Sequence, residues 1–224
     1  MPVIDYDKQC IDVSEWQGKP DWSLVSTVKS FALIRYADGL SIDEQVERNV
    51  REAYANGMRI GLWVYSYPNG NADRPIQEAK KMCEYANSVR EKITMPIFFD
   101  LEEGNEGTQT REFVQQCAVN FCETVKSYGF TPGVYYNGDY NARYYGNDFW
   151  AEHPDYVKWF AFPDSGETSQ DYDIWQYSWV GRVPGISTDV DLDVIGDSPI
   201  PPTPPTPHPV IRKFPIMFYL RRRR

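Results

Sequence analysis

Met95-Pro96-Ile97-Phe98-Phe99-Asp100-Leu101-Glu102-Glu103-Gly104 predicts a buried strand that ends in acids. An apolar run of this length, bounded by Pro and Gly, is typical of a strand inside a sheet. Side chains two apart share one face of a strand, so Asp100 and Glu102 are expected to point the same way. Burying carboxyls is costly unless the strand opens into a water-filled site. The pair therefore belongs either to an active site or to a solvated loop.

Seven further strands are predicted, at residues 10–14, 31–36, 60–67, 133–137, 157–162, 173–177 and 189–194. Helical patterns separate the earlier strands, at 41–57, 75–89 and 110–129. The first of these helices is expected to open with a capping box formed by Ser41 and Glu44. Strands that alternate with helices predict parallel β/α units in a barrel. Because the last third is nearly free of helical patterns, the barrel is expected to be incomplete on that side.

Polar side chains cluster where the predicted strands end: Asp12, Arg35, Tyr65, Asp100, Glu102, Asn137 and Gln176. In a β/α barrel the active site lies on the face where the strands run into the βα loops. We therefore expect these side chains to meet in one site. Two carboxyls in such a pocket push each other's pKa values apart, which can leave one an acid and the other a base at neutral pH.

Composition narrows the class of protein. The chain has 224 residues, with 23 basic and 32 acidic side chains. Six of the Lys and Arg, and none of the Asp and Glu, lie after residue 198, so residues 1–198 carry 17 basic and 32 acidic side chains, a formal charge of −15. A domain with such a negative charge is a poor candidate for nucleic-acid binding. With only His153 and His208, a His-rich zinc site is nearly excluded, and a Ser-His or Cys-His arrangement would have to use His153. The four cysteines lack CxxC spacing, which predicts free buried thiols.

Aromatic residues are abundant, with 7 Trp, 16 Tyr and 11 Phe. They suffice for a core, and they would also suit a carbohydrate groove, where flat rings stack on sugars. Trp16 and Trp175 are therefore either core residues or sugar platforms. The position of Tyr65 at a strand end favours the groove. Arg35 either binds substrate or pairs with a buried acid.

Four segments occur in series with suitable gaps: Asp12-Val13-Ser14-Glu15-Trp16-Gln17-Gly18, the strand ending Asp100-Leu101-Glu102, Trp175-Gln176-Tyr177-Ser178, and Gly185-Ile186 leading to Val190-Asp191-Leu192-Asp193. Together they resemble glycoside hydrolase family 25, the lysozymes that cut the muramic acid linkage of bacterial peptidoglycan. The resemblance covers roughly residues 8–196. It implies a flattened, irregular β/α barrel of TIM-like type, with a long acidic groove and no metal or other cofactor.

The resemblance also implies roles for four acids. Glu102 would donate a proton to the leaving oxygen, and Asp100 would orient the 2-acetamido group of the substrate or otherwise stabilise the positive transition state. Asp12 and Asp191 would maintain the electrostatic environment of the site and hold the sugar in place. This agrees with the general need of glycoside cleavage for an acid and for negative charge beside an oxocarbenium-like centre. Whether a carboxylate or the substrate's own acetamide attacks stays open.

The expected substrate-binding residues are Tyr65, Arg35, Trp16, Tyr67, Asn137, Trp175 and Gln176. Some positions depart from the family pattern. Ser66 stands where many relatives carry His, Asp193 stands where Asn is usual, and Ala161-Phe162-Pro163 replaces an Ala-x-Tyr. These departures bear on subsites and pH optimum rather than on the reaction.

The C-terminal part of the chain differs from the rest. We expect a catalytic domain at 1–198 and a Pro-rich spacer at 199–209. Residues 210–224, too short for a domain, are expected to be a disordered basic tail that ends in four Arg. The tail is either a cationic anchor for anionic wall polymers or the remnant of a lost wall-binding module.

No Sec-type signal or transmembrane run is recognised. This favours a monomeric phage-type endolysin, released from the host cytoplasm to the cell wall, with an extracellular enzyme as the alternative; the partner is the peptidoglycan glycan strand. Two other functions compete. A catalytically silent barrel could bind glycan as a recognition module, but it would be expected to lose its acid. A chitinase-like hydrolase also ends a strand in D-x-E, but its glycine-and-aspartate lead-in is missing here.

Overall fold

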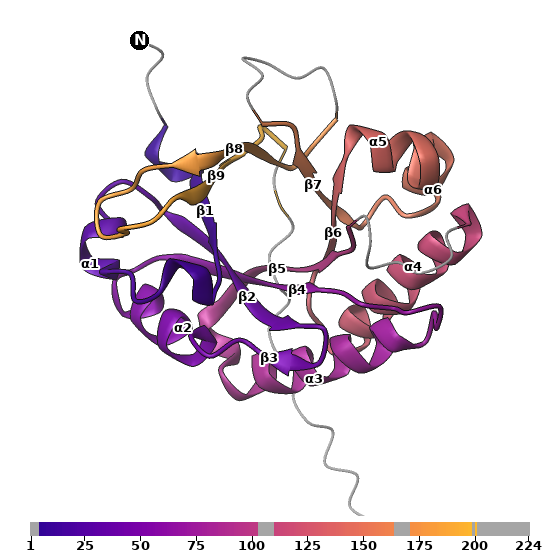
Figure 1. Cartoon of the computed structure of the whole chain (residues 1–224), viewed down its shortest axis with the longest axis horizontal. Helices are drawn as coiled ribbons and strands as arrows, with labels where there is room; N and C mark the ends of the chain where they lie inside the picture. The colour runs from indigo at the N-terminus through magenta and orange to yellow at the C-terminus, as the bar shows by residue number, and fades with distance from the viewer. Residues whose placement is uncertain (1–4, 103–109, 164–170, 199, 201–224) are drawn as a thin grey trace, which may run out of the picture.

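Eight strands close into a barrel in the computed structural model, which describes residues 5–102, 110–163, 171–198 and 200 (Figure 1). The barrel strands are β1 (Gln9–Val13), β2 (Phe31–Asp38), β4 (Arg59–Tyr65), β5 (Ile93–Asp100), β6 (Pro132–Asn137), β7 (Val157–Ala161), β8 (Ile174–Gly181) and β9 (Val190–Ile195). Neighbouring strands from β1 through β8 are parallel, whereas β9 lies antiparallel between β8 and β1 and closes the ring. The short β3 (Ser41–Ile42) extends the sheet beside β2.

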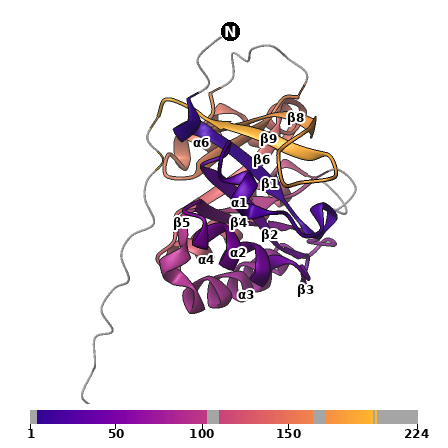
Figure 2. The same cartoon turned by 90° about the vertical axis from the view of Figure 1, so that its left-hand side faces the viewer.

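Helices cover only part of the barrel. The helices are α1 (Trp22–Val25), α2 (Val46–Ala55), α3 (Arg74–Ser88), α4 (Arg111–Ser127), α5 (Gly138–Tyr140) and α6 (Gly146–Glu152), with a π-helical turn η4 (Asn141–Tyr145) and 3-10 turns η1 (Tyr6–Lys8), η2 (Glu15–Gln17) and η3 (Arg90–Lys92). Helices α1 to α4 form an arc on one side, and β8 and β9 lie on the opposite side, uncovered by helix in both views (Figures 1 and 2). The described part of the chain has no helix after Glu152, which confirms the irregular barrel with helices missing in the last third.

The strands bury both of their faces. The barrel interior holds Cys10, Phe31, Leu33, Trp63, Met95, Phe98, Tyr135, Val157, Trp159, Ala161 and Ile174. The outward faces pack with the apolar sides of the helices in a larger cluster. Along β5 and just beyond it, Phe98 faces the interior, whereas Phe99 and Leu101 join the outer cluster. The same alternation directs Asp100 and Glu102 to the inside of the barrel, where β5 ends.

Glycine lets the strands around β5 pack closely. A Cβ atom on Gly133 of β6 would lie 2.3 Å from the ring of Phe98, and one on Gly61 of β4 would lie 2.6 Å from the carbonyl oxygen of Pro96. Any larger residue at Gly133 would push Phe98 out of the barrel interior. Phe98 therefore fills this end of the barrel and leaves the opposite end, beyond Asp100, for polar side chains.

Two local predictions need correction. Ser41 does not cap a helix, because it lies in β3, and α2 begins at Val46 without a side-chain cap. The carboxylate of Asp43 fixes this turn by accepting hydrogen bonds from the backbone N–H groups of Gln45 and Glu15. The helical segment at residues 138–152 was not predicted, and Asn137 caps its first turn.

All four cysteines are buried and free, as predicted. None of the helices in the described ranges is long and apolar enough to cross a membrane. The Pro-rich segment and the basic tail lie outside the described residues, apart from Ile200. That side chain packs against the interior cluster, so the proposed boundary at residue 198 excludes one residue that contacts the barrel.

Candidate active site

The strand ends of the barrel enclose a cavity of about 440 Å³ that carries five carboxyl groups. It is lined by Asp12, Ser14, Trp16, Gln17, Arg35, Asp38, Trp63, Tyr65, Tyr67, Asp100, Glu102, Tyr135, Trp159, Gln176 and Asp191. The four acids expected to act in the reaction are all among these lining residues. So are five of the seven expected substrate-binding residues.

Glu102 lies just beyond β5 and is half-buried. The hydroxyl of Tyr65 donates a hydrogen bond to Glu102 Oε2 at 3.3 Å. Burial raises the pKa of Glu102, while the hydrogen bond from Tyr65 and the neighbouring hydroxyl of Tyr135 lower it. The balance is a carboxyl that keeps its proton to higher pH than an exposed Glu does, as a proton donor requires.

Asp100 is buried at the end of β5, and its Oδ1 atom has no hydrogen-bond partner among the described residues. Its pKa is raised well above the usual value, first by burial and then by the neighbouring charge of Glu102, while Arg35 lowers it. An unpaired carboxyl oxygen that faces a cavity can accept a hydrogen bond from a substrate group or face a developing positive charge.

Asp12 on β1 and Asp191 on β9 are neighbours across paired strands. The amide nitrogen of Gln176 donates to Asp12 Oδ2 at 2.9 Å, which fixes that carboxyl. The amide oxygen of Gln176 in turn accepts from Tyr135 and from Trp179, both at 2.9 Å. Burial, followed by the charge of Glu102, raises the pKa of Asp191 to about 7.

A further acid, Asp193 on β9, interacts with Asp12 and Asp191 but does not line the cavity. It is fully buried and accepts a hydrogen bond from Trp159 Nε1 at 2.8 Å. Its Oδ2 atom has no partner among the described donors, and it lies against Asp12, so a hydrogen bond between these two carboxyls requires that one of them be protonated. Burial raises the pKa of both groups, that of Asp193 to about 7 and that of Asp12 well above its usual value.

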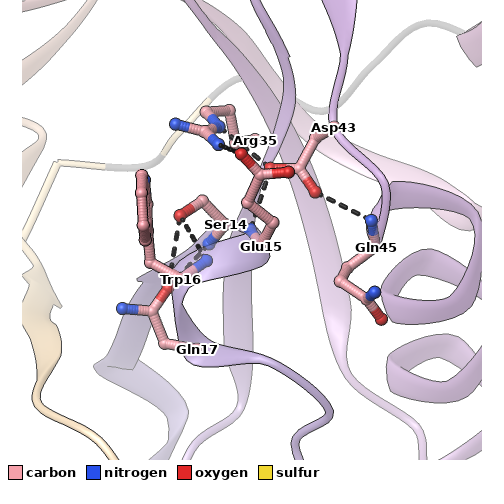
Figure 3. Close-up of polar contacts among 7 residues, drawn as sticks. All are labelled: Ser14, Glu15, Trp16, Gln17, Arg35, Asp43 and Gln45. Carbon is pink, nitrogen blue, oxygen red and sulfur yellow. Dashed lines mark hydrogen bonds and ion pairs between the residues drawn. The ribbon is translucent and has the colours of Figure 1, made fainter.

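Arg35 is held from behind by two carboxylates. Its Nε atom lies 2.9 Å from Asp43 Oδ2, and a terminal nitrogen lies 3.0 Å from Glu15 Oε1 (Figure 3). Its guanidinium also lies 5.8 Å from the centre of the Trp63 ring. Arg35 thus pairs with a buried acid and lines the cavity at the same time.

Aromatic rings form the rim and the floor of the cavity. Tyr65 and Tyr67 meet edge to face, with ring centres 5.4 Å apart. Trp16 is 74% exposed, so it is a rim residue and not part of the core. Trp179, which is 53% exposed, reaches the same site through its hydrogen bond to Gln176. It was not predicted, because an odd spacing from Gln176 would place it on the opposite face of a regular strand, and β8 has register shifts after Gln176 and after Ser178.

Two expected binding residues lie away from the cavity lining. Asn137 is exposed, and its side chain accepts from the backbone N–H of Tyr140 at 2.9 Å, which caps α5. Trp175 packs against the outer cluster, and its Nε1 atom donates to the carbonyl oxygen of Phe162 at 3.2 Å. The alternation of β8 explains this position, because Gln176 points inward and its neighbour must point outward.

Ser66, at the position where many family members carry His, is bound to Glu78. Its hydroxyl donates to Glu78 Oε2 at 2.5 Å, and the backbone N–H of Tyr67 donates to Glu78 Oε1 at 3.3 Å. The backbone N–H of Ser66 also donates to the carbonyl oxygen of Asp100 at 2.7 Å. Buried Glu78 on α3 therefore fixes the segment that carries Tyr67 and braces Asp100.

The cavity combines one partly shielded acid with several carboxylates and no unpaired Arg or Lys among its lining residues. Such a set can protonate a leaving oxygen and stabilise a neighbouring positive charge. Within the described ranges, no group of three or more His, Cys, Asp or Glu side chains could hold a metal ion.

The chain is similar to known proteins both in sequence and in fold. The sequence pattern of Glycosyl hydrolases family 25 matches residues 11–186. Lysozyme M1 of Streptomyces globisporus is 28% identical over 206 residues, which cover 85% of this chain and 68% of that protein. The catalytic domain of endolysin ply40 from bacteriophage P40 of Listeria monocytogenes is 25% identical, with a TM-score of 0.67 over 85% of this chain and 93% of that one. A bacterial lysozyme from Streptomyces coelicolor has the same fold, with a TM-score of 0.69 at 22% identity over 85% and 93% of the two chains.

Proposed function

The chain belongs to glycosyl hydrolases family 25 and is a glycoside hydrolase, and on this premise we propose that it hydrolyses the β-1,4 linkage between N-acetylmuramic acid and N-acetylglucosamine in bacterial peptidoglycan. It acts at the cell wall, as a monomer, on the glycan strand. The observation that carries the proposal is the pair of Asp100 and Glu102 at the end of one strand, inside a cavity rich in carboxyls.

Glu102 is the general acid. Its proton goes to the glycosidic oxygen as the bond from that oxygen to the anomeric carbon breaks. The raised pKa supports this role because it lets the carboxyl keep its proton to higher pH, and the hydrogen bond from Tyr65 orients the carboxyl. A water molecule later adds to the anomeric carbon and returns a proton to the Glu102 carboxylate.

Asp100 stabilises the positive charge that develops at the sugar ring. Its unpaired Oδ1 atom supports a hydrogen bond to the N–H of the substrate's 2-acetamido group, which would orient the acetamide oxygen toward the anomeric carbon. Asp12 and Asp191 keep the surrounding potential negative and contact the sugar. Their paired strands support a fixed separation between them.

Other residues that line the cavity bind the sugars of the substrate. Trp16, Tyr65 and Tyr67 offer ring faces and hydroxyls to the sugars, and Arg35 and Gln176 offer N–H donors. Asn137 and Trp175 have no part in this proposal. Trp179 takes the place expected of Trp175, because it is exposed and linked to Gln176.

The products of peptidoglycan digestion test the proposal. Mass spectrometry after borohydride reduction should find muramic acid at the new reducing ends. Reducing-end glucosamine would make the protein a glucosaminidase. Intact glycan, under conditions in which the folded protein binds it, would favour a silent recognition module.

A further inference from the structure

A second cavity opens beside the catalytic one. Its volume is about 470 Å³, within the range of about 300–1,000 Å³ found for ligand pockets. It is lined by Trp16, Gln17, Gly18, Lys19, Asp21, Gly185, Ile186, Ser187 and Thr188. Trp16 and Gln17 line both cavities, so the two adjoin at the exposed Trp16.

The walls of the second cavity are tied together. The backbone N–H of Asp21 donates to the carbonyl oxygen of Gly185 at 2.8 Å, and the side-chain amide of Gln17 donates to the carbonyl oxygen of Asp189 at 3.2 Å. A Cβ atom on Gly185, which has a φ of 92°, would lie 2.5 Å from the carbonyl oxygen of Asp21. The loop after η2 and the connection between β8 and β9 therefore meet in a fixed arrangement.

The two cavities differ in charge. The catalytic cavity has five carboxyl groups, and its arginine is paired with Asp43 and Glu15. Among the residues that line the second cavity, the charged ones are Lys19 and Asp21. The Asp21 carboxylate is engaged by the N–H and hydroxyl of Ser23, at 3.1 and 2.6 Å, whereas Lys19 is exposed. The first cavity thus offers no unpaired cation to an anionic group, whereas the second offers the exposed ammonium of Lys19.

Resting on the proposed function, we infer that the second cavity binds the anionic stem peptide carried by the muramic acid of the substrate. The stem peptide is attached through a lactyl ether beside the cleaved linkage, and it bears free carboxylates. When the sugar lies in the catalytic cavity, the stem peptide attached to it must extend out of that cavity past the rim residue Trp16. The Lys19 ammonium and the hydroxyls of Ser187 and Thr188 provide donors for peptide carboxylates and carbonyls.

Two soluble substrates of equal glycan length test the inference, one with stem peptides and one from which an amidase has removed them. Lys19→Glu should lower kcat/KM on the peptide-bearing substrate by about five- to tenfold, the scale of an exposed charge pair that is reversed. Lys19→Gln should lower it less. Both variants should stay within about twofold of the parent on peptide-free glycan, because that substrate has no group that contacts the Lys19 ammonium of the parent.

Lys80→Glu, which makes the same change in charge on an exposed residue of α3, is the matched control and should affect neither substrate selectively. Equal losses of kcat/KM on both substrates would show that the cavity is a further sugar subsite. No loss on either substrate would show that Lys19 takes no part in binding. Both results overturn the inference and leave the proposed function standing. A parent protein that cleaves neither substrate would overturn the proposed function itself, and the inference with it.

Discussion

The hydroxyl of Tyr65 donates a hydrogen bond to Glu102 Oε2 over 3.3 Å, from the end of β4 to the residue just beyond β5. This bond favours the charged form of Glu102 and opposes the effect of burial on its pKa. The pKa of this acid is therefore set by a balance between its shielded position, which raises it, and two tyrosine hydroxyls, which lower it.

Tyr65→Phe should shift the pH dependence of the reaction. Without the hydroxyl, the pKa of Glu102 rises further, so the acid keeps its proton to higher pH. The basic limb of kcat/KM should move upward by about half a unit to one unit. Rates on soluble glycan fragments from pH 4 to pH 9 provide the measurement. Tyr67→Phe is the control, because the Tyr67 hydroxyl bonds to Asp38 and not to Glu102. A limb that stays in place or moves downward would contradict this role of Tyr65.

Asp100→Asn should reduce kcat more than it raises KM. The change keeps the shape of the side chain and removes the anion next to the developing positive charge. We expect kcat to fall about 10²–10³-fold, the usual scale for losing one stabilising group. Asp38→Asn, at another carboxylate of the same cavity, should leave kcat within a few-fold of the parent. If Asp100→Asn raises KM and spares kcat, Asp100 only binds substrate.

Asp193→Asn should change how stability depends on pH. The pKa of Asp193 is raised from 3.8 to about 7, so between these values the folded protein holds a proton that the unfolded chain has released. The free energy of unfolding therefore falls as the pH rises through this window. An Asn can still accept from Trp159 and donate to Asp12, without titrating.

The Asp193→Asn variant should consequently unfold with a free energy higher by up to about 4 kcal/mol at pH 8, and close to that of the parent at pH 4. Urea denaturation at the two pH values measures this difference. A change of the same size at both pH values would mean that packing, and not the proton, sets the effect.

Removing the C-terminal segment should leave the barrel intact. A chain cut after Ile200 should keep its melting temperature and its activity on soluble fragments, because the packing of Ile200 is retained. A cut after Ser198 should lower the melting temperature slightly. If the Arg cluster is an anchor, both cuts should weaken binding to whole cells, less so as salt increases. If the truncated and the full-length protein clear cells equally at low salt, the segment is a remnant and not an anchor.

The period-2 alternation of the strands carried most of the prediction of the site. It directed Asp100 and Glu102 to one face, and the barrel then brought Asp12 and Asp191 to the same end. Applied to β8, the same rule would have rejected Trp175, since Gln176 faces inward. Trp175 was chosen for its residue type. The exposed Trp179 was overlooked, and the period-2 rule would not have found it either, because the register shifts in β8 break the alternation after Gln176.

Other features depend on contacts that no local pattern reveals. Ser41 and Glu44 match a capping box, but hydrogen bonds from the distant Glu15 and from Arg35 to Asp43 fix that turn differently. The burial of Asp193 under Asp12 follows from the antiparallel pairing of β9 with β1, which the sequence alone did not predict. The second cavity likewise requires two loops that are more than 160 residues apart to meet, as Asp21 and Gly185 do.

The turnover of Glu102→Gln tests the central claim most directly. Glutamine keeps the size and the polar contacts of the side chain but has no proton to give. Turnover on soluble peptidoglycan fragments should fall by about 10²–10⁴-fold, while the melting temperature and the affinity for glycan stay close to those of the parent. Turnover within a few-fold of the parent would show that Glu102 is not the acid, and the proposed mechanism would be wrong.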